Sequence, residues 1–154
     1  MASRGNHGQS QARAAAAAGL AATIVVPHGN AREKNDAMRS FGATLIEHGR
    51  DFDEAREEAS RQAALEDLLL VPPFHTALVS GVASYALELF AAVADIKKVY
   101  VPIGCGSGIC GVIAARDALG LETEVIGVVS TEATAAQQAF LSGKPESTAT
   151  ARTF

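Results

Sequence analysis

Residues 99–120 read VYVPIGCGSGICGVIAARDALG, and this stretch decides the fold. The β-branched run 99–103 predicts a strand, and residues 109–119 predict a helix that ends at Gly120. Glycines between them allow a tight turn in which backbone N–H groups converge, and the positive end of the following helix favours an anion. We therefore expect a phosphate group to bind this loop, which comprises Gly104, Cys105, Gly106, Ser107 and Gly108.

Two alternatives remain open for this loop. The first is a close-packed turn between a strand and a helix that binds no ligand. The second rests on the pattern G-x-G-x-x-G from Gly106 to Gly111, with Glu132 near the end of the next strand as the acidic residue for a ribose. A dinucleotide-binding domain usually opens with this pattern, whereas strand candidates precede it here, so the sequence favours the phosphate loop.

Helical and strand patterns alternate along the rest of the chain, with short connections. Helices are predicted for residues 7–18, 31–41, 51–67, 75–94, 109–119 and 132–141. Strands are predicted for residues 22–26, 43–47, 68–71, 99–103 and 124–129. Such alternation predicts an α/β fold, a three-layer domain in which a mostly parallel sheet carries helices on both faces.

Composition narrows the class of protein. The chain has 154 residues, 48% of them hydrophobic and 19% charged, which suits one compact domain. A net charge of -4 with scattered Lys and Arg argues against nucleic acid as a partner. Apolar runs are interrupted well before the roughly 20 residues of a membrane span, so no membrane association is expected. Cys105 and Cys110 fit neither a disulfide framework nor a zinc site, and we expect no metal and a cytoplasmic location.

A second polar loop lies at the start of the chain. Residues 3–9 read SRGNHGQ and precede an alanine-rich helix. Ser3 and Asn6 offer side-chain hydrogen bonds, and unbonded amides at the start of a helix can hold a carboxylate. The alternative is a helix N-cap without a ligand. In an open α/β sheet such a loop normally follows a strand, and the sequence shows none before it. We therefore interpret the chain as the middle of a larger protein.

Together, the two loops resemble those of threonine and serine dehydratases, which are fold-type-II pyridoxal phosphate enzymes related to the tryptophan synthase beta subunit. Residues 3–9 resemble their substrate loop, Ser-x-Gly-Asn-His-x-Gln, and residues 101–108 resemble their glycine-rich phosphate loop. Further matches fall between and after these loops in the family's order: Thr23 to Pro27, Lys34, Gly42-Ala43, Phe52 to Ala55, and Val125 to Val128. The resemblance covers nearly the whole chain.

The resemblance implies a role for each loop residue. Asn6 would form a hydrogen bond with the phenolic oxygen of pyridoxal 5'-phosphate. The substrate carboxylate would be held by Ser3, Gly5, Asn6 and His7. The cofactor phosphate would be held by Gly104, Cys105, Gly106 and Ser107, next to Gly108.

The chain departs from the family pattern at three places. Cys105 and Ser107 replace two glycines of the phosphate loop, so the Cys105 side chain must point away from the anion. The family's Gly-Gln-Gly-Thr segment reads Gly81-Val82-Ala83-Ser84, which leaves the choice of substrate open. The family's Schiff-base lysine lies upstream of the Asn loop, so we expect no catalytic residue within this chain.

We therefore expect residues 1–145 to be the central part of the catalytic domain of a pyridoxal phosphate enzyme, and residues 146–154 to be a polar tail. The implied reaction is an ammonia-lyase reaction that converts L-threonine or L-serine to a 2-oxo acid and ammonia, with the full-length enzyme a homo-oligomer. Three alternatives stay open. They are a serine racemase or β-replacement enzyme, a dinucleotide-binding oxidoreductase of the Rossmann type, and a catalytically inactive module for phosphate binding or subunit contact.

Overall fold

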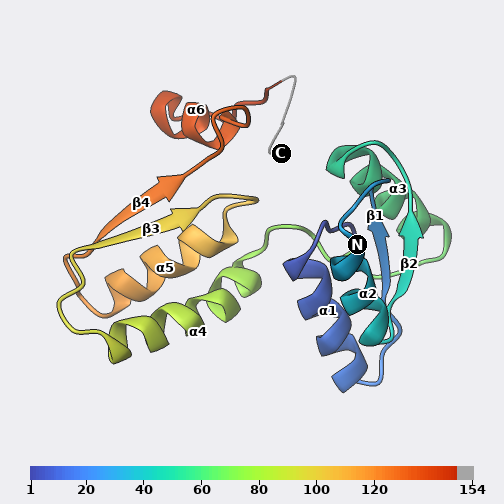
Figure 1. Ribbon diagram of the computed structural model, residues 1–154, viewed down its shortest axis with the longest axis horizontal. Coiled ribbons are helices and arrows are strands. Elements are labelled where there is room, and N and C mark those ends of the chain that lie inside the picture. Colours follow the sequence, from blue (N-terminus) through green and yellow to red (C-terminus); the bar gives the residue numbers. More distant parts are fainter. Residues whose placement is uncertain (149–154) are drawn as a thin grey trace. The chain divides into compact units, whose positions relative to one another are not determined.

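The computed structural model describes residues 1–148. The chain divides into two compact units, and the boundary in the sequence lies between Pro73 and Phe74. The first unit contains α1 (Asn6–Ala17), β1 (Thr23–Val26), α2 (Arg32–Ser40), β2 (Thr44–Glu47) and α3 (Phe52–Leu65). The second contains α4 (Thr76–Ala92), β3 (Lys98–Pro102), α5 (Ser107–Ala118), β4 (Glu124–Val128) and α6 (Ala135–Ser142). Strands and helices alternate in both units, apart from the direct succession of α3 and α4 (Figure 1).

In the first unit, β1 and β2 pair in parallel, with Thr23 opposite Thr44 and Val26 opposite Glu47. The chain start also joins this sheet, because Ala2 forms a parallel bridge with Val25. Ser3 N–H donates to the Val25 carbonyl at 3.1 Å, and Val25 N–H donates to the Met1 carbonyl at 2.9 Å. The expectation that no strand-like segment precedes the Ser3 loop was therefore wrong, since residues 1–3 run alongside β1.

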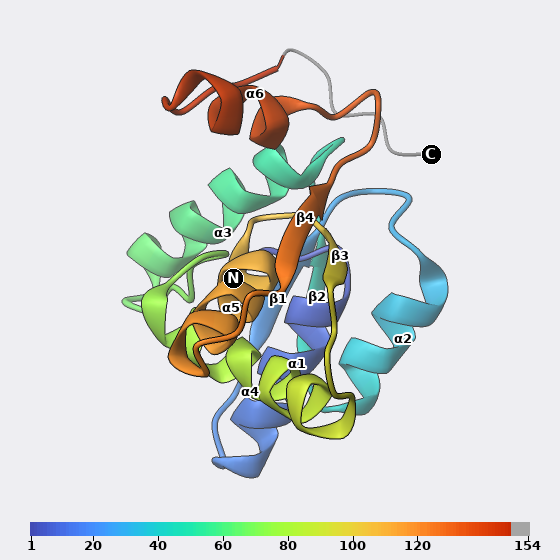
Figure 2. The same ribbon diagram turned by 90° about the vertical axis from the view of Figure 1, so that its left-hand side faces the viewer.

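Side chains of β1 form the core of the first unit and face alternate sides of the sheet, as strand geometry requires. Ile24 and Val26 pack with Ala12 and Met38 of the helices α1 and α2. Val25 faces the opposite side and packs with Ala55 and Ala59 of α3. These strand residues are at most 1% exposed, and burial of each contributes about 1.5–3 kcal/mol. The first unit thus has three layers, with α1 and α2 on one face of the strands and α3 on the other (Figure 2).

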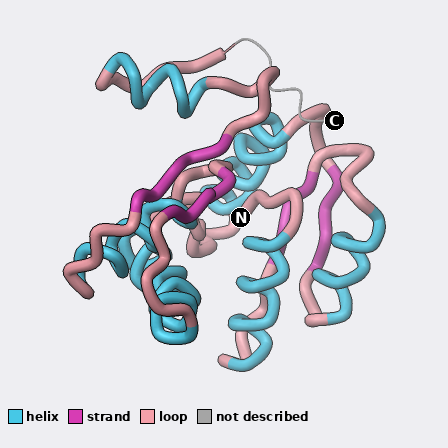
Figure 3. The backbone as a smooth tube through the Cα atoms, turned by 60° about the vertical axis from the view of Figure 1, so that its left-hand side comes forward, coloured by secondary structure: helices cyan, strands magenta, loops and turns pink. Residues whose placement is uncertain are grey.

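In the second unit, β3 and β4 also pair in parallel, from Lys98 opposite Glu124 to Pro102 opposite Val128. The helices α4 and α5 cover one face of this pair and bury Ala86, Val101, Val112 and Ala115 (Figure 1). Both described sheets contain only parallel strands, which lie side by side in Figure 3. The predicted α/β fold class with parallel strands is confirmed.

One predicted strand is wrong. Residues 68–71 are an apolar run, but they form no strand, and Leu69 is 91% exposed. The chain leaves α3 through Asp67 with a left-handed φ of 51°, and Leu68 N–H then donates back to the Ala63 carbonyl. This turn ends the helix. Instead of pairing in a sheet, Leu70 and Val71 line a small cavity of about 210 Å³ together with residues of α3.

Among the described residues, no helix is long and apolar enough to cross a membrane. Of the predicted polar tail, residues 149–154 lie outside the described part of the chain.

Helix α3 offers a direct test of local folding. The Asp51 carboxylate accepts a hydrogen bond from Glu54 N–H at 3.0 Å, and the Glu54 carboxylate accepts one from Arg50 N–H at 2.8 Å. Because this cap satisfies amides that the helix cannot, Asp51→Ala should lower the free energy of unfolding by about 1 kcal/mol. Urea unfolding followed by circular dichroism measures the change. The matched control is Asp53→Ala, which removes only an exposed ion pair with Arg56 and should cost clearly less.

Candidate functional site

The glycine loop lies where the sequence predicts it, at the carboxyl end of β3. The strand ends at Pro102, and the residues from Gly104 to Gly106 turn the chain into α5. Gly106 is the N-cap with a left-handed φ of 97°, a conformation that L side chains rarely adopt. The helix begins at Ser107, two residues before the predicted start, so Ser107 and Gly108 belong to its first turn.

The first turn of α5 presents unbonded amides. Within residues 1–148, the backbone N–H groups of Gly106, Ser107, Gly108 and Ile109 donate no hydrogen bond, and no side chain caps the helix. A side chain placed at Gly104 or Gly108 would meet nothing within 4 Å, so the space beside these residues is open. Amide N–H groups at the start of a helix and next to open space can donate hydrogen bonds to a bound anion.

Gly111, the last glycine of the dinucleotide pattern, has a role in helix packing. Gly111 packs against α4, because a Cβ atom there would lie 3.0 Å from the backbone N of Ala83 and 3.3 Å from the Val79 carbonyl oxygen. Glu132 lies exposed in a turn four residues beyond the end of β4. Gly111 therefore serves helix packing within the second unit, where the close approach of two helices needs a residue without a side chain.

The loop before α1 is organised by Ser3, which is only 4% exposed. Its Oγ accepts hydrogen bonds from Gly8 N–H at 2.8 Å and from Gly5 N–H at 3.2 Å. Gly5 is the N-cap of α1, and Gln9 N–H donates to its carbonyl at 3.1 Å. Ser3 therefore caps the helix, whereas the N–H groups of Asn6 and His7 donate no hydrogen bond within the described part of the chain.

His7 is half-buried and carries an unsatisfied nitrogen. Its Nε2 is buried without a hydrogen-bond partner among the described residues. Burial lowers the pKa of the imidazole below its ordinary value, a hydrogen bond with the Pro72 backbone opposes this shift, and the N-terminal ammonium adds to it. Proline offers only a backbone carbonyl, so in neutral His7 the other ring nitrogen carries the proton and Nε2 is a hydrogen-bond acceptor.

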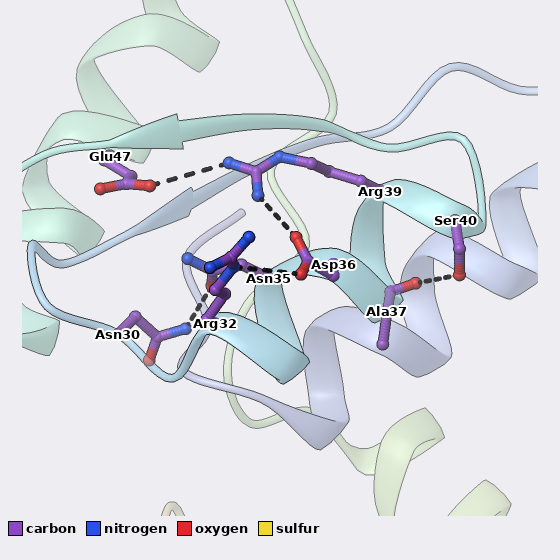
Figure 4. A network of polar contacts seen from close by, with 8 residues as sticks. All are labelled: Asn30, Arg32, Asn35, Asp36, Ala37, Arg39, Ser40 and Glu47. Atoms are coloured by element: carbon purple, nitrogen blue, oxygen red, sulfur yellow. Dashed lines mark hydrogen bonds and ion pairs between the residues drawn. The ribbon is translucent and has the colours of Figure 1, made fainter.

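Other loops of the first unit meet at the same edge of the sheet. His28 N–H, after β1, donates to the Gly49 carbonyl at 2.9 Å, and His48 N–H, after β2, donates to the Val26 carbonyl at 2.8 Å. Asn30 donates to the buried Asn35 at 2.6 Å, which fastens the first of these loops to α2 (Figure 4). The loop from Ser3 to Gly5 follows a strand-like segment parallel to β1, so it too lies at the carboxyl end of the strands.

For one residue near this loop, the sequence predicted a match to the family but no role. Lys34, in the first turn of α2, resembles a solvated surface lysine by its charged neighbours, and it is indeed exposed. Its side chain nevertheless covers Gly5, with Cδ 2.9 Å from the position that a Cβ atom on Gly5 would occupy. The available signal was topological, because α1 and α2 both begin at the carboxyl edge of β1.

We predict that Ser3→Ala destabilises the first unit by about 1–3 kcal/mol, because the Gly5 and Gly8 amides lose their buried acceptor. Urea unfolding measures the loss, and faster amide hydrogen exchange at Gly8 should accompany it. Ser10→Ala is the matched control on the same helix, since its exposed hydroxyl donates only to the Asn6 carbonyl. Equal stability losses for the two variants would contradict the capping role of Ser3.

The lowered pKa of His7 predicts a pH-dependent stability. In the unfolded chain the imidazole takes up a proton near pH 6.5, whereas in the folded chain it does so only at lower pH. This contribution to stability is complete above pH 6.5 and is lost as the pH falls from there through the folded pKa. His7→Gln should therefore reduce the loss of stability between pH 7 and pH 5. Titration of the His7 ring protons by NMR checks the cause, and a pKa of 6.5 or higher would refute it.

Comparison with known proteins gives a consistent result. The family described as "Pyridoxal-phosphate dependent enzyme" matches residues 1–154. The biosynthetic L-threonine dehydratase of Pasteurella multocida is 38% identical over 145 residues, which cover 94% of this chain and 28% of that protein. The L-threonine ammonia-lyase of Thermotoga maritima is 38% identical over 128 residues, 82% of this chain and 32% of that protein. The chain thus spans about a third or less of these relatives.

Solved structures of pyridoxal phosphate enzymes have a similar fold. The processed form of threonine deaminase isoform 2 from Solanum lycopersicum superposes with a TM-score of 0.86 at 29% identity, covering 97% of this chain and 44% of that one. Maize serine racemase superposes with a TM-score of 0.86 at 25% identity, covering 98% and 46%. The dinucleotide-binding alternative is thereby overturned, because the match to the pyridoxal phosphate family includes the glycine loop itself. By its sequence along its whole length and by its fold, the chain belongs to the family of pyridoxal-phosphate dependent enzymes.

Proposed function

We propose that this chain is part of an ammonia-lyase that converts L-threonine, or L-serine, to a 2-oxo acid and ammonia with pyridoxal 5'-phosphate as cofactor. The observation that carries the proposal is the pair of loops at carboxyl strand ends, Ser3–His7 and Gly104–Gly108, each opening a helix with unbonded amides. Threonine dehydratases at 35–38% identity support the reaction. In this proposal, residues 1–145 contribute both units to one catalytic domain.

The residues present fit the cofactor. Its phosphate would lie against the amides of Gly104, Cys105, Gly106 and Ser107 and of the neighbouring Gly108, where the glycine backbone leaves room for the oxygens. The exposed Asn6 side chain would donate to the phenolic oxygen. When bound, the cofactor supplies an electron sink for the electrons released as the substrate α-proton leaves. A phosphate loop anchors it at one end and leaves its reactive end to residues elsewhere.

The substrate carboxylate would be held by the loop that contains Ser3, Gly5, Asn6 and His7. The N–H groups of Asn6 and His7, which donate no other hydrogen bond among the described residues, are the donors. Ser3 shapes this loop through its bonds to Gly5 and Gly8. Fixing the carboxylate would orient the α-C–H bond for the base. After the β-hydroxyl has left as water, hydrolysis of the released enamine would give the 2-oxo acid and ammonia.

The base that moves the α-proton would come from outside these residues. All four lysines, Lys34, Lys97, Lys98 and Lys144, are exposed. Lys98 Nζ is paired with Glu124 at 2.9 Å, at the end of β3 opposite the glycine loop. A lysine that carries the cofactor needs a desolvated site, and the exposed positions of these four do not provide one. We further propose that the complete enzyme is a cytoplasmic homo-oligomer without nucleic acid or membrane partners.

The resemblance to maize serine racemase supports racemisation as the second candidate. It begins with removal of the same α-proton and differs in that the β-hydroxyl is retained. Assay of products from L-serine separates the two, because the lyase yields ammonia and a 2-oxo acid, whereas the racemase yields D-serine.

The phosphate loop can be tested on this chain. Inorganic phosphate or pyridoxal phosphate should shift the NMR amide signals of Ser107, Gly108 and Ile109. Gly106→Ala should weaken this binding about tenfold or more, because alanine is strained at a φ of 97° and the loop must change shape. Gly120→Ala, which also replaces a glycine of positive φ (64°) beyond the other end of α5, should leave binding unchanged. Unmoved amides at saturating phosphate would contradict the proposal.

The origin of the catalytic lysine has its own test. With pyridoxal phosphate supplied, this chain alone should not dehydrate threonine or serine faster than the free cofactor does. Borohydride reduction followed by peptide mass mapping should find no stoichiometric phosphopyridoxyl adduct on any of the four lysines. A stoichiometric adduct on one lysine, together with turnover of threonine, would place the catalytic lysine inside the chain.

A further inference from the structure

The side chain of Lys34 lies on the backbone of Gly5. A Cβ atom on Gly5 would lie 2.9 Å from Lys34 Cδ, 3.4 Å from Nζ and 3.5 Å from Cε. Approaches below 3.0 Å are essentially never seen for real Cβ atoms, so an alanine at this position would displace the lysine stem. Glycine at position 5 therefore lets the Lys34 stem cover the loop and brings its ammonium group to within reach of the first turn of α1.

Lys34 is not in an ion pair among the described residues, unlike Arg32, Asp36 and Arg39 on the same helix. Asp36 pairs with Arg39 at 3.3 Å and with Arg32 at 3.8 Å, and Arg39 reaches Glu47 at 3.7 Å (Figure 4). Among residues 1–148, Lys34 forms no ion pair and no side-chain hydrogen bond. Asp36 and Glu47 are thus paired with arginines, whereas Glu33 and Lys34 form no ion pair among the described residues, and Lys34 is the cation beside Gly5.

We propose that Lys34 is a substrate-binding residue that supplies the positive charge for the substrate carboxylate. This inference rests on the proposed function of residues 3–7. A carboxylate has two oxygens, and the N–H groups of Asn6 and His7 can bind one while the Lys34 ammonium pairs with the other. A lysine suits this position, because its compact charge on a flexible stem adjusts to the ligand without a fixed geometry.

The test uses the chain as given, with L-threonine and its methyl ester as probes, and follows the amide signals of Asn6 and His7 by NMR. The ester lacks the carboxylate charge, so the wild-type chain should bind L-threonine more tightly. Lys34→Met keeps an unbranched stem over Gly5 but removes the charge, and it should weaken L-threonine binding about fivefold while leaving ester binding unchanged. Lys34→Arg should restore most of the preference for L-threonine.

Arg32→Met is the matched control, because it removes the same charge from the same helical turn. Its side chain is 94% exposed and contacts Asp36 instead of Gly5, so L-threonine binding should stay at the wild-type level. Should Lys34→Met fail to fold, Lys34→Gln replaces it as the uncharged variant.

The outcomes distinguish a role of Lys34 from carboxylate binding by the loop of residues 3–7. If the uncharged variant binds L-threonine as tightly as the wild type, the role of Lys34 is overturned and the carboxylate loop stands. If L-threonine leaves the amides of the wild-type chain unmoved, the carboxylate loop itself is overturned, and the inference with it. Phosphate binding at Gly104–Gly108 is judged independently by its own titration.

Discussion

Parallel pairing is the constraint on which both candidate loops depend, because it brings the ends of neighbouring strands to one edge of a sheet. In the first unit, Ser3 N–H donates to Val25 and His48 N–H donates to Val26, so the segments that follow three parallel runs lie together. In the second unit, Ile103 N–H donates to the Val128 carbonyl just before the glycine loop begins. If the strands within a unit were antiparallel, the segments that follow them would alternate between opposite edges of its sheet.

The two loops expose helix amides by different means. Before α5, the left-handed Gly106 turns the chain so that the first turn has no cap. Before α1, the buried Ser3 hydroxyl caps Gly8 and leaves only the amides of Asn6 and His7 without a partner among the described residues. The first arrangement suits a phosphate with several oxygens, and the second suits a smaller carboxylate. This difference is the basis for the two ligands proposed above for these loops.

Charge around the first loop follows from packing more than from composition. The chain carries a net charge of -4, yet Asp36 of α2 is paired with Arg32 and Arg39, and the Lys34 side chain lies against Gly5. A positive charge thus lies beside the first loop of an acidic protein. Such a charge can attract a carboxylate group even where the surface as a whole is negative.

The sequence by itself determined the fold class, the strands β1 to β4 and both loops, because these features rest on local physics. Runs such as Thr23–Val26 have few alternatives to a buried strand, and glycines before a helix dictate a turn. The tertiary structure alone decided what depends on neighbours. Residues 68–71 are as apolar as a strand but find no partner to pair with. Residues 1–3 pair with β1, and the Lys34 side chain lies against Gly5. Both contacts join residues more than twenty positions apart, so they exist only once the chain has folded around β1.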